Sequence, residues 1–466
     1  MPLRGDLCYL RAMSKESANI VICGAGIAGV SAAFHLAVRN GVKGIVLVDE
    51  RPPLTLTSDK STECYRNWWP GPGDAMIALA NRSIDLLEQL ARETDNAFLM
   101  NRRGYLFATA ENGAALIDAA RETTSLGASD LRHHIGSAAA YVPAPPHGFE
   151  DQPDGVDLFD DPDLIQQVFP YLSDTTTTVA HARRCGWLSA QQLGMTMLTQ
   201  ARDAGVTLLR GSLSAVDTNG GRINGVTVET DSGTTEIAAP ALVNSAGPFT
   251  PALARLCGLE LPIALEGHGK ISCSDPRHAV PRDAPLVIWN DEVALPWSAE
   301  ERKALAESPE TRALLEPFVA GVHGRPEGAG NTVLLYWTYE GGSSDLVLPV
   351  PYDPNYPEIT IRGMSAVIPR LAEYFDQMPR PYVDGGYYAK TPENRPLVGP
   401  LPLEGAFICG AFSGFGIMTA MAGGDLLAAH IAGTPLPDYA PAFLLSRYDD
   451  PSYDALMATA TASGQL

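Results

Sequence analysis

The chain has 466 residues, of which 45% are hydrophobic and 19% are charged, and its formal net charge at pH 7 is −21. This length predicts two closely connected domains rather than a single core. The excess negative charge argues against nucleic acid and against an anionic membrane as partners, because both attract basic surfaces. No apolar run is long enough to predict a membrane-spanning helix.

The cysteines and the N-terminus indicate a cytoplasmic protein. None of the cysteines forms a C-x-x-C pair, which favours a reducing compartment and argues against a zinc or other metal site. Residues 1–17 carry charged side chains without the apolar segment of a signal peptide, so we expect a loose N-terminal extension in which Met13 is an alternative start. The seven cysteines are Cys8, Cys23, Cys64, Cys185, Cys257, Cys273 and Cys409.

A glycine-rich motif follows the first apolar segment. Residues 20–23 predict a buried strand, residues 30–37 predict a helix, and G-x-G-x-x-G lies between them. Such glycines permit a tight turn, the approach of a pyrophosphate and close packing of helix on strand, and the helix N-terminus attracts phosphates. The motif predicts a dinucleotide site formed by Gly24, Gly26, Ile27, Ala28 and Gly29.

The next apolar strand, residues 44–48, ends in Asp49-Glu50-Arg51. An acid about 20 residues after the glycines is expected to hold a ribose hydroxyl, but it does not distinguish NAD from FAD. The hydroxyl-rich loop at residues 52–66 is then expected to cross the cofactor face, with Lys60, Ser61 and Thr62 near the phosphates; a solvated connection is the alternative.

Further along the chain, apolar spacing and turn residues predict the remaining elements. We expect a long irregular excursion over residues 141–163, where proline, aspartate and glycine accumulate, and a short β-meander over residues 205–237. Helices are expected at 75–94, 111–123, 189–204, 299–319, 364–375 and from 417 to 431. Other strands are expected at 104–108, 240–248, 266–273, 286–290, 332–339 and 405–410.

Three segments together resemble the FAD-dependent oxidoreductases of the D-amino-acid oxidase, sarcosine oxidase and glycine oxidase superfamily. They are residues 20–50, the strand ending in Ala246-Gly247, and residues 384–400, which contain Thr-Pro-acid and Pro-Leu-Val-Gly and lead into a Gly-x-x-Ser-Gly-x-Gly turn. The resemblance implies an α/β (α+β) fold. One domain would be a Rossmann-like FAD-binding domain of the glutathione-reductase type, and the second a mainly antiparallel β-sheet domain for the substrate.

The resemblance also implies how the chain is divided. The FAD-binding domain would comprise 18–110, 186–262 and 384–448, and the substrate domain would comprise 111–185 and 263–383. Flavin contacts are expected from Leu213, Ala246, Gly247, Gly410, Gly414, Phe415, Gly416 and Ile417. A turn that opens a helix presents N–H groups able to stabilise the negative charge of a reduced flavin.

The chemistry implied by the resemblance is oxidation of a C–N bond of an amine or amino acid. Hydride passes to flavin N5 from the carbon next to the nitrogen, the imine hydrolyses, and oxygen or an electron-transfer acceptor takes up the electrons. Noncovalent FAD is expected, with Cys64 the alternative for covalent attachment. The oligomeric state is left open.

Two departures from the family leave the substrate open. Tyr388 replaces an arginine that binds the substrate carboxylate in glycine-oxidase-like members, and Met418 replaces a lysine of monomeric sarcosine oxidases. The remaining cations that could replace these anchors are Arg66, Lys270, Lys390 and Arg395, with His268 as a further candidate.

The predicted catalytic set is His268, Lys270, Tyr336, Tyr388 and Arg66. Tyr336 shares a strand face with the residue two positions on, whereas Trp337 and Tyr339 share the other face, so only one group can line a pocket. Three other functions stay open: a 2-hydroxy-acid dehydrogenase, a flavin-binding subunit active only within a complex, and a pyridine-nucleotide enzyme.

Overall fold

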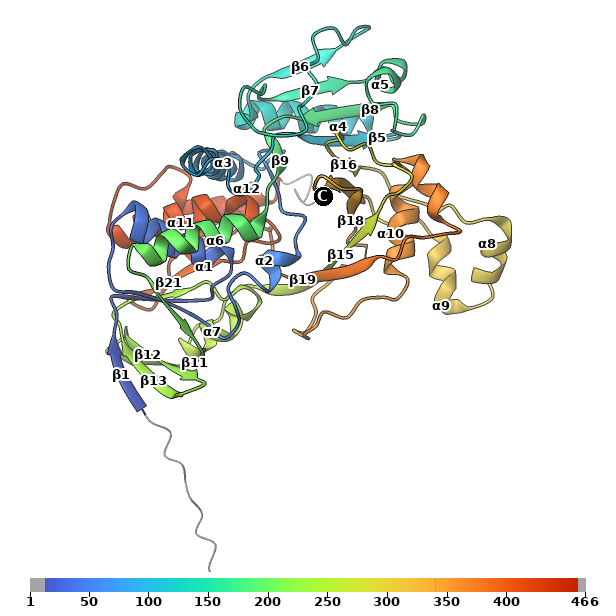
Figure 1. Ribbon diagram of the computed structural model, residues 1–466. Coiled ribbons are helices and arrows are strands. Elements are labelled where there is room, and N and C mark those ends of the chain that lie inside the picture. Colours follow the sequence, from blue (N-terminus) through green and yellow to red (C-terminus); the bar gives the residue numbers. More distant parts are fainter. Residues whose placement is uncertain (1–12, 340, 460–466) are drawn as a thin grey trace, which may run out of the picture.

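The computed structural model describes residues 13–339 and 341–459. A parallel sheet lies between a layer of helices and a small second sheet, and a larger sheet of nine strands lies beside them (Figure 1). The mixed α/β fold predicted from the sequence is confirmed.

The parallel sheet is the centre of the first part. Its strand order is β10-β3-β2-β14-β21-β20, and β20 alone runs antiparallel to its neighbour. The strands are β2 (Ile20–Cys23), β3 (Ile45–Asp49), β10 (Thr207–Arg210), β14 (Leu242–Asn244), β20 (Leu397–Pro400) and β21 (Ala406–Gly410).

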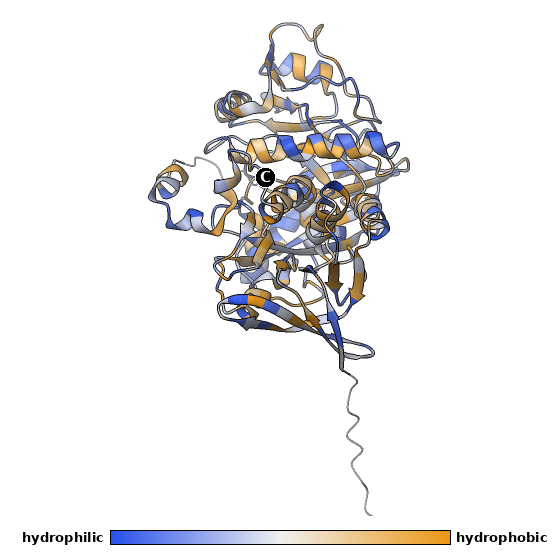
Figure 2. Cartoon of the chain, turned by 90° about the vertical axis from the view of Figure 1, so that its left-hand side faces the viewer, coloured by the Kyte–Doolittle hydropathy of each residue, from blue (hydrophilic) through white to orange (hydrophobic). Residues whose placement is uncertain are grey.

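Both faces of this sheet are covered, which explains its continuous apolar strands. Ile22 and Leu47 pack into one core with the helices, whereas Val21 and Val46, which point the other way, pack into a second core with the small sheet. Figure 2 shows apolar and polar residues alternating along the helices, as expected for elements with one buried face. The helices are α1 (Ile27–Phe34), α3 (Ala75–Glu93), α6 (Ala190–Asp203) and α11 (Gly416–Ala432).

The small sheet changes one prediction about the N-terminus. Residues 13–17 were expected to be a loose extension, but they form β1 (Met13–Ser17), which pairs in parallel with β13 (Gly233–Ala238). Residues 1–12, including Cys8, lie outside the described residues. The other strands are β11 (Ser212–Asn219), β12 (Arg222–Thr230) and β13 (Gly233–Ala238), so the predicted meander is present.

The large sheet has the order β19-β15-β18-β17-β16-β5-β8-β7-β6 and is mainly antiparallel. It includes β5 and β19, although β5 and most of β19 fall within segments expected in the FAD-binding domain. Its strands are β5 (Tyr105–Thr109), β6 (Leu131–His134), β7 (Val156–Phe159), β8 (Thr178–Ala182), β15 (Ala264–Ser274), β16 (Leu286–Trp289), β17 (His323–Glu327), β18 (Thr332–Tyr336) and β19 (Tyr382–Lys390).

Short elements complete the chain. Strands β4 (Cys64–Arg66) and β9 (Cys185–Trp187) pair with each other and connect the two parts. Helix α10 (Tyr356–Met364) covers one face of the large sheet and α4 (Gly113–Thr123) the other. The remaining helices are α2 (Thr57–Lys60), α4 (Gly113–Thr123), α5 (Pro162–Val168), α7 (Thr250–Leu256), α8 (Ala299–Leu305), α9 (Pro309–Arg312), α10 (Tyr356–Met364) and α12 (Pro451–Met457).

Several predicted elements have different bounds in the structure. The helix expected over 299–319 is broken into α8 and α9, because Ser308 and Pro309 start a new helix. The helix expected over 364–375 begins earlier, as α10, and continues after Pro369 only as a short 3-10 helix. The strand expected over 332–339 ends at Tyr336, and the irregular excursion at 141–163 contains β7.

Three further findings concern the described residues. None of their helices has the length and apolar character to cross a membrane. Their six cysteines are all free. No group of three or more of their histidine, cysteine, aspartate and glutamate side chains is arranged to hold a metal ion.

Candidate active site

A cavity of about 540 Å³ runs between the glycine-rich turn before α1 and the small-residue turn before α11. It lies where parallel strands β2, β14 and β21 end, which is the usual ligand position in such sheets. Of the predicted cofactor residues, Gly29, Lys60, Thr62 and Phe415 do not line it, whereas the others do.

The glycine-rich turn fits its predicted role because two positions exclude a side chain. Gly24 has a φ of 105°, and an added Cβ there would overlap the carbonyl oxygen of Ser245. A Cβ on Gly29 would overlap the carbonyl oxygen of Gly24, so this glycine allows close packing without facing the cavity. The backbone can therefore approach a bound phosphate closely.

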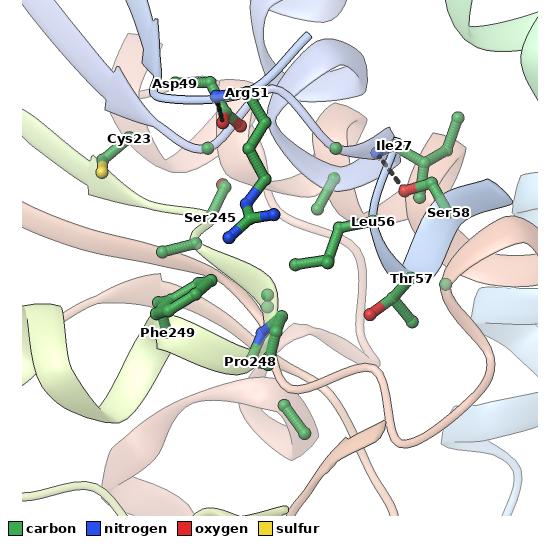
Figure 3. A pocket seen from close by; sticks show the side chains of 18 of the residues that line it. Cys23, Ile27, Asp49, Arg51, Leu56, Thr57, Ser58, Ser245, Pro248 and Phe249 are labelled. Carbon is green, nitrogen blue, oxygen red and sulfur yellow. Dashed lines mark hydrogen bonds between the residues drawn. The ribbon is translucent and has the colours of Figure 1, made fainter. Parts of the chain in front are cut away.

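Ser58 lies at the N-terminus of α1, a position that the sequence prediction missed. Its Oγ accepts a hydrogen bond of 2.9 Å from the backbone N–H of Ile27 (Figure 3). The sequence predicts Ser61 or Thr62 at a phosphate instead. Only Ser61 lines the cavity, and the sequence alone could not distinguish Ser58 from the other hydroxyls of this loop.

Asp49 shapes the adjoining turn at the end of β3. Its two carboxylate oxygens accept hydrogen bonds from the backbone N–H groups of Ala25, at 2.6 Å, and Arg51, at 2.8 Å. The side chain of Arg51 extends into the cavity (Figure 3). This end of the cavity therefore presents an acid for hydroxyl groups and a cation for phosphates.

Residues 57–63 form a segment, here called the strap, that runs from the phosphate end of the cavity toward the large sheet. At one end Thr57 donates to the carbonyl oxygen of Tyr387 at 3.1 Å. Further along, Lys270 of β15 donates to the carbonyl oxygens of Ser61 at 2.8 Å and Asp59 at 3.3 Å. The strap is thus held by a side chain and a backbone carbonyl group of the large sheet.

A second cation holds the far end of the strap. Arg325 of β17 is fully buried and donates to the carbonyl oxygen of Thr62 through Nη2 at 2.7 Å and Nε at 3.0 Å. It also pairs with Glu327 and lies 4.9 Å from the Trp187 ring. Lys60 instead pairs with Asp384 at 2.9 Å, outside the cavity lining.

The turn before α11 closes the opposite end of the cavity. Gly414 has a φ of 95°, and a Cβ there would overlap the ring of Tyr388. No side chain among the described residues caps the N-terminus of α11. Its first N–H groups are therefore suited to a ligand that carries partial negative charge.

Four rings form a row across adjacent strands of the large sheet, beginning at this turn. The Tyr388 ring stacks on His268 at 3.8 Å, His268 faces Tyr336 at 6.1 Å, and Tyr336 faces His323 at 4.8 Å between centroids. The hydroxyl of Tyr336 donates to that of Tyr388 at 2.7 Å. All four side chains are buried or nearly so.

His268 has a polar neighbour at each ring nitrogen. Its Nε2 lies 2.8 Å from Glu266 Oε1, and its Nδ1 lies 2.6 Å from the Thr338 hydroxyl. Burial opposes ionisation of Glu266, but hydrogen bonds from His268 and Lys390 outweigh it and lower the pKa of Glu266 to about 2. Burial lowers the pKa of His268, and the nearby Glu266 opposes this shift.

The candidate cations occupy different places. Arg66 of β4 is buried, about 6 Å from the rings of Tyr105 and Phe415, and burial lowers its pKa. Lys390 pairs with Glu266 at 3.0 Å. Arg395 lies away from the cavity, where it donates to the carbonyl oxygen of Pro72 and lies 5.8 Å from a tyrosine ring.

The aromatic residues at the end of β18 and just after it lie on two different faces, as their alternation predicted. Tyr336 belongs to the ring row, and Thr338, two residues on, contacts His268. Trp337 and Tyr339 instead pack against Phe318 in the core of the large sheet.

His323 and Arg325 were missed because β17 was not predicted. The strand contains Gly324 and Pro326, two residues that argue against a strand in a sequence. Because Gly324 and Pro326 alternate with His323 and Arg325, this segment lacks the alternating apolar residues that predict a strand. Only the neighbouring strands show that these two side chains belong to the site.

Comparisons with known proteins agree with this geometry. A family model described as FAD dependent oxidoreductase matches residues 19–430. No curated protein sequence matches the chain.

Solved structures share the fold at low sequence identity. An L-proline dehydrogenase from P. horikoshii is 18% identical with a TM-score of 0.68, covering 93% of this chain and 98% of its own. A glycine oxidase from Geobacillus kaustophilus is 16% identical with a TM-score of 0.68, covering 93% and 99%. An iminodiacetate oxidase from Chelativorans sp. BNC1 is 19% identical with a TM-score of 0.65, covering 91% and 98%.

The match of the family model over most of the chain agrees with the resemblance drawn from the three sequence segments, and the cavity has the glycine-lined ends that the cofactor of this family requires. The chain therefore belongs to the FAD-dependent oxidoreductase family, and FAD is its cofactor.

Proposed function

We propose that this enzyme oxidises the C–N bond of an amino acid or a related amine. The observation that carries the proposal is the row of four rings, which meets the cofactor cavity at Tyr388 and Gly414. The matching structures named for proline, glycine and iminodiacetate, all of which have a C–N bond next to a carboxyl group, support it.

Two ends of the cavity suit the two ends of FAD. Gly24, Gly26 and the N-terminus of α1 would hold the pyrophosphate, with Asp49 or Glu50 on the ribose. Gly414, Gly416 and the N-terminus of α11 would hold the flavin ring, near Ala246 and Gly247. Bound there, the flavin supplies a hydride acceptor for the substrate carbon.

The ring row gives the substrate a dry, rigid surface. Buried aromatic rings exclude water and fix the position of a small molecule packed against them. Burial raises the pKa of Tyr388 to about 12, so its hydroxyl keeps its proton at neutral pH. Because Tyr336 already donates to the Tyr388 oxygen, the Tyr388 proton is available to a substrate oxygen or nitrogen.

Arg66 is the cation best placed to hold a substrate carboxylate. Arg66 lies beside Phe415, next to the turn that faces the flavin end of the cavity. A planar guanidinium in a buried site can form two parallel hydrogen bonds with a carboxylate.

The test is an anaerobic substrate panel with the FAD-loaded enzyme, followed by flavin absorbance. The panel comprises glycine, L-alanine, L-proline, N-methylglycine, iminodiacetate and simple alkylamines, with lactate and glycolate as C–OH controls. We expect bleaching by at least one amino acid or amine and none by the hydroxy acids.

Other results would contradict the proposal. Bleaching by lactate or glycolate alone would show C–OH oxidation, and bleaching by dithionite alone would indicate a subunit that needs a partner. Mixing the reduced enzyme with oxygen then shows whether oxygen or another acceptor takes the electrons.

A further inference from the structure

A second cavity, of about 660 Å³, lies between the beginning of α3 and the helix α12 (Figure 1). It shares no lining residue with the cofactor cavity. Its volume is in the range that small organic ligands occupy in proteins. The charged side chains of its lining decide which ligand fits, and they are Asp74, Arg395, Asp438, Arg447 and Asp450.

Arg395 is a buried cation with hydrogen-bonding capacity left over. Only 1% of this residue is exposed. Its Nη2 donates to the carbonyl oxygen of Pro72, whereas its Nη1 has no hydrogen-bond partner. Within the part of the chain that the structure describes, no carboxylate forms an ion pair with Arg395. The carboxylate of Glu393 pairs instead with Arg447 at 2.6 Å and accepts hydrogen bonds from two tyrosine hydroxyl groups.

The surroundings of Arg395 leave its charge only partly compensated. Burial lowers the pKa of Arg395, and Arg447 adds to this effect, whereas Tyr453 and Glu393 oppose it. A guanidinium keeps its proton even so, and a buried N–H without an acceptor costs free energy. An anion that enters the cavity and accepts from Nη1 would remove this cost.

The N-terminus of α3 adds a second source of positive potential. This helix has 19 residues, its first turn contains no acidic side chain, and no side chain among the described residues caps it. Its first N–H groups therefore attract an anion. Arg395 donates to Pro72, three residues before the helix begins, and the first residues of α3 line the same cavity as Arg395.

The aspartates of the lining limit which anion can bind. Asp74 and Asp438 are exposed, and the carboxylate of Asp450 accepts from the backbone N–H and the hydroxyl of Ser452. Their negative charges disfavour an ion with two charges, such as phosphate, more than an ion with one. The apolar part of the lining suits a ligand with an apolar body, and it includes Ala75, Ala78, Leu444 and Leu456.

We propose that this cavity is a second ligand site, in which Arg395 Nη1 and the N-terminus of α3 bind the carboxylate of a small, partly apolar molecule. An organic acid and an amino acid both carry this group, and the ammonium of an amino acid would be attracted by the aspartates of the lining. The site is separate from the proposed C–N oxidation, so either proposal can fail without the other.

The experiment is isothermal titration calorimetry of the FAD-loaded enzyme with three probes. Pivalate and 2-aminoisobutyrate have the same shape, differ by a methyl group in place of the ammonium, and carry no hydrogen on the carbon next to the carboxylate, so neither can be oxidised there. The third probe is inorganic phosphate. We expect saturable binding of at least one carboxylate, more tightly than phosphate and without a change in flavin absorbance. The tighter of the two carboxylates shows whether the natural ligand is an organic acid or an amino acid.

Two variants locate the binding. Arg395→Gln removes the cation, and Ala78→Phe fills part of the cavity from α3 while leaving Arg395 in place. We expect each to raise the dissociation constant of the carboxylate by about 10-fold or more, as for the loss of a hydrogen bond to a charged group, and to leave FAD binding unchanged. The matched control is Arg222→Gln, because Arg222 lies on the surface and pairs with Glu404, so this variant should bind the carboxylate as the native protein does.

Three results would overturn the proposal. They are the absence of saturable carboxylate binding up to about 50 mM, tighter binding of phosphate than of either carboxylate, and carboxylate binding that Ala78→Phe leaves unchanged. Thermal unfolding shows whether each variant is folded. If Arg395→Gln does not fold, Ala78→Phe still decides whether the ligand occupies this cavity.

Discussion

Replacing Lys270 by Met tests whether the strap is needed to hold FAD. Lys270 Nζ donates to two strap carbonyl oxygens, and Met keeps the length of the side chain while removing both hydrogen bonds. Hydrogen bonds to charged groups contribute about 1.5–3 kcal/mol each. Lys270 is half-buried and its bond to Asp59 is long, so we take about 2 kcal/mol for the pair together.

This free energy should appear in the affinity for FAD, because the strap carries Ser58 at the N–H of Ile27 and Thr57 at Tyr387. About 2 kcal/mol corresponds to a roughly 30-fold rise in the FAD dissociation constant. The assay is titration of the apoprotein with FAD, followed by flavin fluorescence. The matched control is Lys390→Met, which removes a lysine of the neighbouring strand β19 that pairs with Glu266 rather than with the strap.

The outcome that would refute the reasoning is specific. If Lys270→Met binds FAD as tightly as the native protein, or if Lys390→Met weakens binding equally, the strap does not couple the large sheet to the cofactor. Reoxidation of the reduced variant by oxygen gives a second readout. An unchanged rate would be consistent with a lysine that holds backbone and takes no part in the reaction with oxygen.

Three further predictions concern other positions. Gly414→Ala should weaken FAD binding by about 10-fold or more in the same titration, because the positive φ alone costs about 1–2 kcal/mol and the new methyl group overlaps the Tyr388 ring; unchanged affinity would show that the turn can shift. Glu266→Gln should lower stability to unfolding by urea at pH 6, and the difference from the native protein should shrink as the pH falls below 4.5 toward 2, because the lowered pKa of Glu266 stabilises the fold only while the carboxylate is ionised; a pH-independent difference would argue against its pairing with His268. Arg395→Met should lower the melting temperature and leave the dissociation constant of the substrate within about twofold, since this side chain lies away from the cavity; a large change in that constant would place Arg395 at the substrate.

The cofactor half of the molecule could be predicted from the sequence because its signals are local. Glycines at 24, 26 and 29 occur within six residues between an apolar strand and a helix, and this spacing can be recognised although the carbonyl oxygen that excludes a side chain at Gly24 belongs to the distant Ser245. The turn at Gly414 is equally local. Motifs of this kind can be recognised in a short stretch of sequence, without knowledge of how the rest of the chain folds.

The substrate side could be predicted only in part, because it depends on distant pairings. His268 was a good candidate by its position in a strand, but its bonds to Glu266 and Thr338 required the partner strand to be known. His323 became visible only when β17 was placed beside β18. Lys270 illustrates the same limit, since a cation on the correct strand face proved to contact backbone carbonyl oxygens of the strap.

The short strand β1 has a practical consequence for how the protein is produced. Met13–Ser17 covers the edge of β13, and Lys15 lies 3.7 Å from Glu236 on that strand. A chain starting at Met13 keeps all five paired residues, whereas one trimmed to Ala18 leaves the edge of β13 open. An exposed edge strand pairs readily with another chain, so the shorter version should aggregate on purification, although no residue of the active site has been removed.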